Sequence, residues 1–262
     1  MNVLITGAGS GIGQAVAQYF KELGHDVYGI DVKYGYAKNL KYSFVADITS
    51  EEQLKEAKEQ LILDNVELDA IINIAGIHKM ASLAESDFNT MKRVIDINLC
   101  GTMLVCRVFH SILKKKGRVI IVTSEVANLD PMPFNGLYNV SKTALDCYAQ
   151  ALRQELNLIG QRVITIRPGA IKTPLCSGSL TDTERLANET SLYKKQAHKF
   201  LGITKKFMGT PMSPEKLSKI IYNATYKKHP KLIYQKHRNP GLVLLNLLPK
   251  RLQCSIIKAL LK

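Results

Sequence analysis

The segment Val3-Leu4-Ile5-Thr6-Gly7-Ala8-Gly9-Ser10-Gly11-Ile12-Gly13 decides the fold of this chain. An apolar run leads into clustered glycines and then into an amphipathic pattern, the order expected for a strand, a tight turn and a helix. Amides at the start of such a helix, together with the helix dipole, favour a bound pyrophosphate. The segment therefore predicts a dinucleotide site at Gly7, Ser10, Gly11, Ile12 and Gly13.

The spacing of these glycines is a variant of the common fingerprint. Ile12 stands where the pattern G-x-G-x-x-G places its last glycine. Taken alone, the segment is also compatible with a glycine-rich turn that binds nothing, so its neighbours have to decide.

An acid follows the second expected strand. Residues 25–30 form that strand, and Asp31 ends it. Asp31 can accept hydrogen bonds from both adenosine ribose hydroxyls and would repel a 2′-phosphate, which favours NAD over NADP. Lys33 is a weak signal in the other direction, and the alternative for Asp31 is a plain turn residue that closes a strand.

Two further strand ends supply candidate cofactor contacts. A loop is expected over residues 32–40, a third strand over 41–46 and a fourth over 68–73. The turn Asn73-Ile74-Ala75-Gly76 follows the fourth strand, at the edge where open α/β sheets place their ligands. The predicted contacts are Asp47, Ile48, Asn73, Ala75 and Gly76.

A long helix is expected from Asp87 to Lys114, and Asn98 is the odd member of its apolar stripe. A carboxamide on a buried face needs hydrogen-bond partners, so Asn98 is either a structural plug or a site residue. After this helix, a fifth strand is expected over residues 119–123, and Ser124 ends it.

The pentad Tyr138-Asn139-Val140-Ser141-Lys142 carries the reactive groups. Tyr138 and Lys142 lie four apart on the first turns of a helix expected over 136–159, so they share a face. A tyrosine titrates at roughly 10, but an adjacent ammonium and a nicotinamide cation would stabilise the phenolate and make Tyr138 a usable acid or base. The spacing is common by chance, and it gains weight here because it follows a dinucleotide turn and a serine at a strand end.

The last part of the expected sheet leads to the substrate. A sixth strand over 162–167 closes in a loop with free amides and a hydroxyl that can hold a carboxamide, from which we expect cofactor contacts by Pro168, Gly169, Ile171 and Thr173. The segment 174–211 should form a substrate loop. Its apolar residues favour an apolar substrate such as a hydroxysteroid or a lipid-like alcohol, although they also suit a small packing cluster; they are Leu175, Leu180, Leu186, Leu192, Phe200, Leu201, Phe207 and Met208.

Together these motifs resemble those of the short-chain dehydrogenase/reductase family, in the same order and over roughly residues 1–235. The matching positions are Thr6-Gly7-x-x-x-Gly11-Ile12-Gly13, Asn73 to Gly76, Asn98, Ser124, Tyr138-x-x-x-Lys142 and Pro168 to Thr173. The resemblance implies an α/β fold with one Rossmann-like, doubly wound parallel sheet of about seven strands in the order 3-2-1-4-5-6-7, followed by a C-terminal helical extension.

The resemblance also implies a catalytic tetrad of Asn98, Ser124, Tyr138 and Lys142. Hydride would pass between NAD(H) and the carbinol carbon of a secondary alcohol or ketone, while Tyr138 moves the hydroxyl proton. Ser124 would bind the reacting oxygen, Lys142 the nicotinamide ribose, and Asn98 a water on the proton path. Two departures are visible: Ile74 replaces the second asparagine of N-N-A-G, and a longer loop before Tyr138 leaves Thr123 as a lesser candidate for the serine role.

Two other kinds of function use the same fold. A dinucleotide-binding redox sensor or scaffold would not need turnover, and the complete tetrad argues against it. Reductases of 3-oxoacyl or of sugar and polyol substrates are the alternatives within the enzymes.

Composition limits partners and compartment. The chain has 262 residues, 46% of them apolar, which suits a single domain over 1–262. Its formal charge is +14, but the lysines are scattered, and the histidines lack metal-ligand spacing, so neither nucleic acid nor a metal is expected.

Unpaired cysteines and the absence of a leader or spanning run predict a cytoplasmic protein. Surplus apolar residues on the helices at 87–114 and 136–159 predict a homo-oligomer, either a dimer or a tetramer.

The last stretch, 240–262, is basic and amphipathic, with Pro249 between two helical segments. In the second segment, Arg251, Ser255, Lys258 and Lys262 share one side and Leu252, Ile256, Ile257, Ala259, Leu260 and Leu261 the other, interrupted by Gln253. Such helices more often pack on protein, here over the pocket or a sister subunit, and peripheral contact with an anionic membrane is the alternative.

Overall fold

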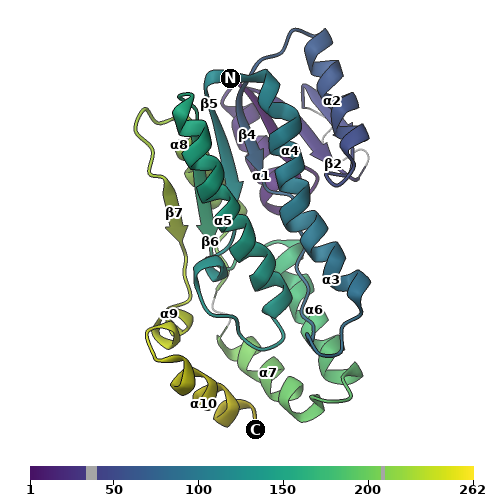
Figure 1. The fold of residues 1–262 in the computed structure, drawn as a ribbon, viewed down its shortest axis with the longest axis vertical. Helices are drawn as coiled ribbons and strands as arrows, with labels where there is room; N and C mark the ends of the chain where they lie inside the picture. Colours follow the sequence, from purple (N-terminus) through teal and green to yellow (C-terminus); the bar gives the residue numbers. More distant parts are fainter. Residues whose placement is uncertain (34–39, 208–209) are drawn as a thin grey trace.

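The computed structural model describes residues 1–33, 40–207 and 210–262, and its centre is a seven-stranded parallel sheet (Figure 1). The strand order is β3-β2-β1-β4-β5-β6-β7, which confirms the expected topology. The order reverses between β1 and β4, and the carboxyl ends of the strands on either side form a natural ligand-binding edge. The strands are β1 Asn2–Thr6, β2 Asp26–Asp31, β3 Tyr42–Val45, β4 Leu68–Asn73, β5 Leu113–Val122, β6 Arg162–Pro168 and β7 Ile233–Lys236.

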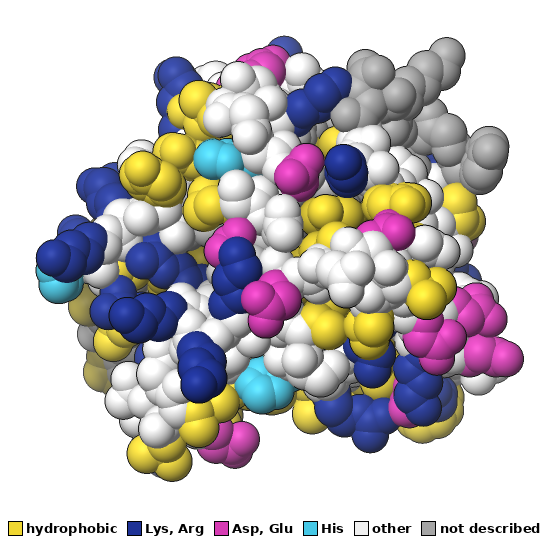
Figure 2. Space-filling view, turned by 90° about the horizontal axis from the view of Figure 1, so that it is seen from above, with side chains coloured by type: hydrophobic (Ala, Val, Ile, Leu, Met, Phe, Trp, Pro, Cys, Tyr) yellow, Lys and Arg dark blue, Asp and Glu magenta, His cyan; other side chains and the backbone are white. Residues whose placement is uncertain are grey.

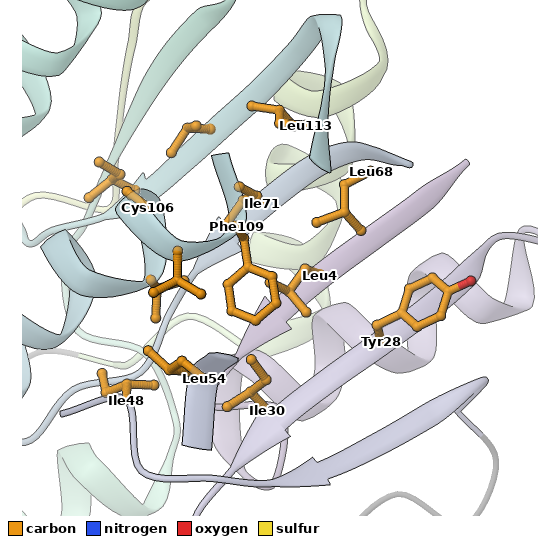
Figure 3. Packing of buried hydrophobic residues seen from close by; sticks show 14 of the residues in the cluster. Leu4, Tyr28, Ile30, Ile48, Leu54, Leu68, Ile71, Cys106, Phe109 and Leu113 are labelled. Atoms are coloured by element: carbon orange, nitrogen blue, oxygen red, sulfur yellow. The ribbon is translucent and has the colours of Figure 1, made fainter. Parts of the chain in front are cut away.

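Helices cover both faces of the sheet because successive strand residues point to opposite sides. Leu4 of β1 packs with helices α2 (Glu51–Leu63), α4 (Thr102–Phe109) and α5 (Gly136–Leu158). Figure 3 shows this side, where Phe109 of α4 and Leu54 of α2 lie close to Leu4 and Ile30 of the sheet. Val3 and Ile5 of β1 pack on the other side with α1 (Gly11–Glu22) and α8 (Pro214–Tyr226).

The helix expected from Asp87 to Lys114 ends earlier and is not uniform. It consists of α3 (Phe88–Ile95), a π-helical turn at Asp96–Gly101, α4 and a 3-10 turn at His110–Ile112. The fifth strand then begins at Leu113 rather than Val119, because Leu113 pairs with Leu68 of β4 and a register shift follows before Arg118. By length and composition alone, Phe88–Ile112 would suffice to cross a membrane, but α4 buries its Phe109 in the core.

The expected substrate loop is a pair of helices, α6 (Pro174–Glu189) and α7 (Lys194–Phe207). Thr173 caps α6 by accepting a hydrogen bond from the amide of Cys176, and Pro174 occupies the first helical position, where its missing N–H costs nothing. Leu186, Phe200 and Leu201 pack with Met80 and Phe134 in a third apolar cluster. The packing-cluster alternative therefore holds for part of the expected apolar set, whereas Leu192 is exposed.

Two expectations fall on residues outside the described ranges. The loop over residues 32–40 is described only at its ends, and Met208 and the side chain of Phe207 are likewise outside. Beyond β7, the chain continues into α9 (Pro240–Asn246) and α10 (Lys250–Leu261), which lie at the lower end of the molecule near α7 (Figure 1).

Candidate active site

The glycine-rich turn after β1 is shaped by close backbone approaches. Gly7 and Gly11 have φ values of 70° and 52°, which side chains rarely adopt. A Cβ on Gly9 would lie 2.7 Å from the carboxylate of Asp31. A Cβ on Gly13 would lie 2.0 Å from the carbonyl oxygen of Gly7, so Gly13 allows α1 to pack on the turn and does not itself line the site.

A cleft of about 610 Å³ starts at this turn and continues along the carboxyl ends of the strands. Most residues that the sequence predicts for the site line it. They are Gly7, Ser10, Gly11, Ile12, Asp31, Asp47, Ile48, Ala75, Gly76, Ser124, Tyr138, Lys142, Pro168, Gly169, Ile171 and Thr173. Gly13, Asn73 and Asn98 are not among the lining residues.

Asn73 is buried next to the cleft, and its side chain points to α4; its expected cofactor contact stays a prediction. The side chain is buried, and its Nδ2 donates to the Cys106 sulfur at 3.5 Å. Asn73 thus joins the end of β4 to α4.

Asn98 lies in the π-helical turn, and its side chain acts as a structural plug. Its Oδ1 accepts from the amide of Ile77 at 2.7 Å, and its Nδ2 donates to the carbonyl of Ile77 at 2.9 Å. The same Nδ2 also donates to the Ser141 hydroxyl at 3.0 Å. These bonds fix the turn after β4 against the start of α5, so Asn98 positions cleft residues from outside the cleft.

Tyr138, Ser124 and Lys142 come together at one wall of the cleft. The phenol of Tyr138 faces the hydroxyl of Ser124, which acts to lower the pKa of Tyr138. The Nζ of Lys142 lies 5.9 Å from the centre of the Tyr138 ring and donates to the Val122 carbonyl at 3.3 Å. Thr123, the lesser candidate, instead directs its hydroxyl to Asp146 at 3.2 Å.

Burial opposes charge on both reactive side chains. It raises the pKa of Tyr138 to about 12, against the hydrogen bond from Ser124 and together with repulsion from Glu125. It also lowers the pKa of Lys142 to about 8. The protein alone therefore does not produce the stabilised phenolate expected from the sequence, and Tyr138 keeps its proton at neutral pH.

His78 is a site residue that sequence reasoning missed. Its ring lies 4.4 Å from that of Tyr138, and its Nε2 is 3.0 Å from the Oδ1 of Asn135. Burial lowers the pKa of His78 to about 4, so the ring is neutral at physiological pH. The turn after β4 carries His78 into the cleft, and no local pattern in the sequence marks it.

Glu125 is a second missed residue, directly after Ser124. Its Oε2 accepts from the amide of Asn239 at 2.6 Å, and burial raises the pKa of its carboxyl. A Cβ on Gly169 would lie 1.8 Å from the carbonyl oxygen of His237, so the chain beyond β7 runs directly against the loop after β6. Because Asn239 and Leu242 also line the cleft, this late segment completes its wall.

Charged groups at the glycine-turn end are of both signs. The Asp31 carboxylate accepts from the amides of Gly9 at 2.8 Å and Lys33 at 3.1 Å, so it also has the turn role considered from the sequence. Asp47 accepts from the amide and hydroxyl of Thr49. Lys33 and Arg93, the latter unforeseen, line the same cleft.

Comparison with known proteins identifies the family. A family model described as short chain dehydrogenase matches residues 1–184. The chain is 28% identical to a 3-ketodihydrosphingosine reductase of Bacteroides thetaiotaomicron, covering 87% of this chain and 84% of that protein. It is 33% identical to an NADPH-dependent 1-acyldihydroxyacetone phosphate reductase of Schizosaccharomyces pombe, covering 73% and 67%.

Solved structures agree on the fold. A short chain dehydrogenase from Burkholderia cenocepacia in complex with NADP has a TM-score of 0.74 at 20% identity, covering 100% of this chain and 97% of that one. The chain therefore belongs to the short-chain dehydrogenase family, a family of oxidoreductases that bind a nicotinamide dinucleotide.

Proposed function

We propose that this protein is an NAD(H)-dependent oxidoreductase that interconverts an apolar ketone and its secondary alcohol. The observation that carries the proposal is the pairing of Tyr138 with Ser124 at the wall of a cleft that starts at the glycine turn. The pairing gives a proton donor and a second hydrogen-bond group for a single substrate oxygen.

The residues present fit a nicotinamide dinucleotide. The turn at Gly7 and Gly11 leaves a cradle that side chains would fill, at the N-terminus of α1, and this suits a pyrophosphate. A Cβ on Gly76 would lie 3.3 Å from the Lys142 Nζ, so a backbone without a side chain keeps that ammonium accessible from the cleft. When bound, the dinucleotide supplies or accepts the hydride.

The chain's own residues supply the rest of the reaction. Ser124 donates a hydrogen bond to the substrate oxygen and holds it beside Tyr138. Tyr138 gives its phenolic proton to that oxygen as negative charge develops on it. Lys142 would bind the ribose hydroxyls of the cofactor, and its ammonium would place positive charge near the phenolate that remains.

The pKa of about 12 for Tyr138 means that the phenol holds its proton at pH 7. It can therefore donate this proton to a ketone oxygen, whereas the reverse reaction first requires the phenolate.

The far end of the cleft supports an apolar substrate. It is lined by Met80, Met132, Leu175, Phe200, Ile203 and Leu242. Two similar proteins are named as reductases of lipid-related ketones, 3-ketodihydrosphingosine and 1-acyldihydroxyacetone phosphate. We propose a lipid-like ketone ahead of a hydroxysteroid, and both ahead of sugar or polyol substrates.

Asp31 supports NAD as the cofactor. Its carboxylate lies within the cleft against the Gly9 amide, where it would repel a 2′-phosphate. Lys33 and Arg93 also line the cleft, and their positive charge would favour NADP. One similar protein is named as NADPH-dependent.

The direct test is oxidation of NADH and of NADPH with a panel of ketones, including long-chain, acyl, steroid and sugar compounds. We expect turnover with NADH and a long-chain ketone. Binding of NADH without turnover on any ketone would favour the sensor or scaffold function instead.

We also propose a cytoplasmic homo-oligomer. Leu158 and Ile159, at the end of α5, are 85% and 56% exposed and are available to a second copy. Light scattering at micromolar concentration should give at least a dimer mass, and a monomer mass would contradict this.

A further inference from the structure

The C-terminal helices α9 and α10 present leucines to solvent. Leu244 and Leu247 of this region are 66% and 76% exposed, and Leu252 and Leu260 of α10 are 46% and 55% exposed. Leu252 and Leu260 lie on one side of α10, two turns apart, with half-buried Ile256 between them. We call these four leucines the leucine face.

The leucine face is held outward by a different, buried stripe of the same helix. Leu261 and Ile257 pack against α7 in the third apolar cluster, and buried Gln253 donates to the Leu248 carbonyl at 2.8 Å. At the other end, Lys250 pairs with Asp130. The packing expected from the sequence thus uses one stripe of α10, and the exposed leucines belong to another.

The charges that α10 itself presents are all positive. Arg251 and Lys258 of α10 and Lys262 just after it are exposed, Asp130 is the acid that pairs with Lys250, and the sequence has no Asp or Glu after Glu215. The sequence of the neighbouring α7 contains lysines and no acid. At the opposite end of the molecule, acidic side chains are interspersed among the basic ones (Figure 2).

The leucine face lies beside the mouth of the cleft. Leu242 of α9 and Phe200 and Ile203 of α7 line the cleft, and α9 and α7 flank the two ends of α10. If α9 and α10 rest on an apolar surface, a molecule that leaves this surface enters the cleft at its apolar end.

We propose that α9 and α10 dock this protein on the surface of an anionic membrane, with the leucine face inserted at the level of the headgroups. Exposed leucines beside lysine and arginine are the combination that binds such an interface, through apolar burial and attraction to acidic lipids. A second copy of the chain is the weaker occupant, because it would bring the same positive charge to the contact. The docking proposal stands without the proposed function; only delivery of an apolar substrate from the membrane rests on it.

The test is sedimentation of the full-length protein with vesicles of phosphatidylcholine alone and with vesicles that also contain phosphatidylserine. We expect binding to the second kind only, and loss of binding as salt is raised. Leu247→Asp should weaken binding by about tenfold or more, because it removes an inserted side chain and adds a charge of the wrong sign. Leu63→Asp on α2 is the matched control, since Leu63 is 75% exposed and lies at the opposite end of the molecule.

Each outcome of these experiments either supports the docking proposal or overturns it. Wild-type protein that ignores phosphatidylserine vesicles at low salt, equal binding to both kinds of vesicle, or wild-type binding by Leu247→Asp would overturn the proposal. A larger mass in light scattering that Leu247→Asp abolishes, without vesicle binding, would assign the surface to a second copy instead. NADH binding and turnover of a water-soluble ketone, measured on the same variants, should not change, so failure of docking is separable from failure of the proposed function.

Discussion

The two ends of the cleft are built in opposite ways. At the glycine turn, backbone touches backbone: a Cβ on Gly13 would lie 2.0 Å from the Gly7 carbonyl oxygen. At the other end, the wall is made of side chains from α6, α7 and α9, among them Leu175, Phe200 and Leu242. The cofactor end is therefore fixed by atoms that every residue has, whereas the substrate end is shaped by side chains that substitution can change.

Tyr138 stands between the two ends, and its substitution should have the largest effect. Tyr138→Phe removes the proton donor and keeps the ring, so turnover should fall by about 10³-fold. NADH affinity should stay within a few-fold, as measured by NADH fluorescence. Near-normal turnover would remove Tyr138 from the reaction and leave the cleft without its proton donor.

A pair of glycine substitutions tests the contrast directly. Gly13→Ala forces α1 away from the turn, and we expect it to destabilise the fold by about 3 kcal/mol and to weaken NADH binding. Gly202→Ala, in the open part of α7, should stabilise the protein by about 0.5–1 kcal/mol through helix propensity. Urea unfolding of both variants checks this, and equal effects would contradict the close backbone packing at Gly13.

Lys142 should lower the stability of the folded protein, because the wall of the cleft that holds Tyr138 also buries the Lys142 ammonium. Burial lowers its pKa from 10.5 to about 8, so the folded protein binds fewer protons than the unfolded chain between these pH values. Lys142→Met should therefore raise stability by about 2 kcal/mol at pH 7, and the gain should shrink as pH rises from 8 to 10.5. Thermal unfolding across this range measures it, and a variant less stable than wild type at pH 7 would contradict the burial of a charged ammonium.

Substitution of Asp31 should have the smallest effect of these variants, and it tests how the cofactor end of the cleft selects between NADH and NADPH. Asp31→Asn keeps an acceptor for the Gly9 amide but removes the charge, so the preference for NADH over NADPH should narrow by up to about tenfold. Asp31→Ala should narrow it as well and also loosen the turn. An unchanged ratio of kcat/KM for the two cofactors in both variants would leave Asp31 as a turn residue only.

Local signals mark the glycine turn and the Tyr138 to Lys142 spacing, because both depend on neighbours in sequence. The strand order is what the resemblance to the short-chain dehydrogenase/reductase family implies, and the structure has that order. The boundary at Leu113 failed for the converse reason: its apolar periodicity continues that of α4, and only pairing with Leu68 across the sheet assigns it to β5.

His78 and Glu125, which the sequence does not indicate as site residues, reach the site through tertiary contacts. His78 follows Ile77, whose backbone Asn98 holds, and its ring faces Tyr138; Glu125 meets Asn239 across 114 positions of sequence. The helices α6 and α7 had local signals in Thr173 and Pro174, a cap followed by a proline at the first helical position. Packing with Met80 and Phe134 determines which apolar side chains of α6 and α7 face the cleft.

The contact between Gly169 and His237 also bears on how the protein is made. A ribosome releases the sheet strands β1 to β6 well before residues 237–242, yet these late residues close one wall of the cleft. A nascent chain can thus assemble its nucleotide cradle while the catalytic wall is still open to water. We therefore expect catalytic competence only after residues 237–242 have packed against Gly169 and Glu125.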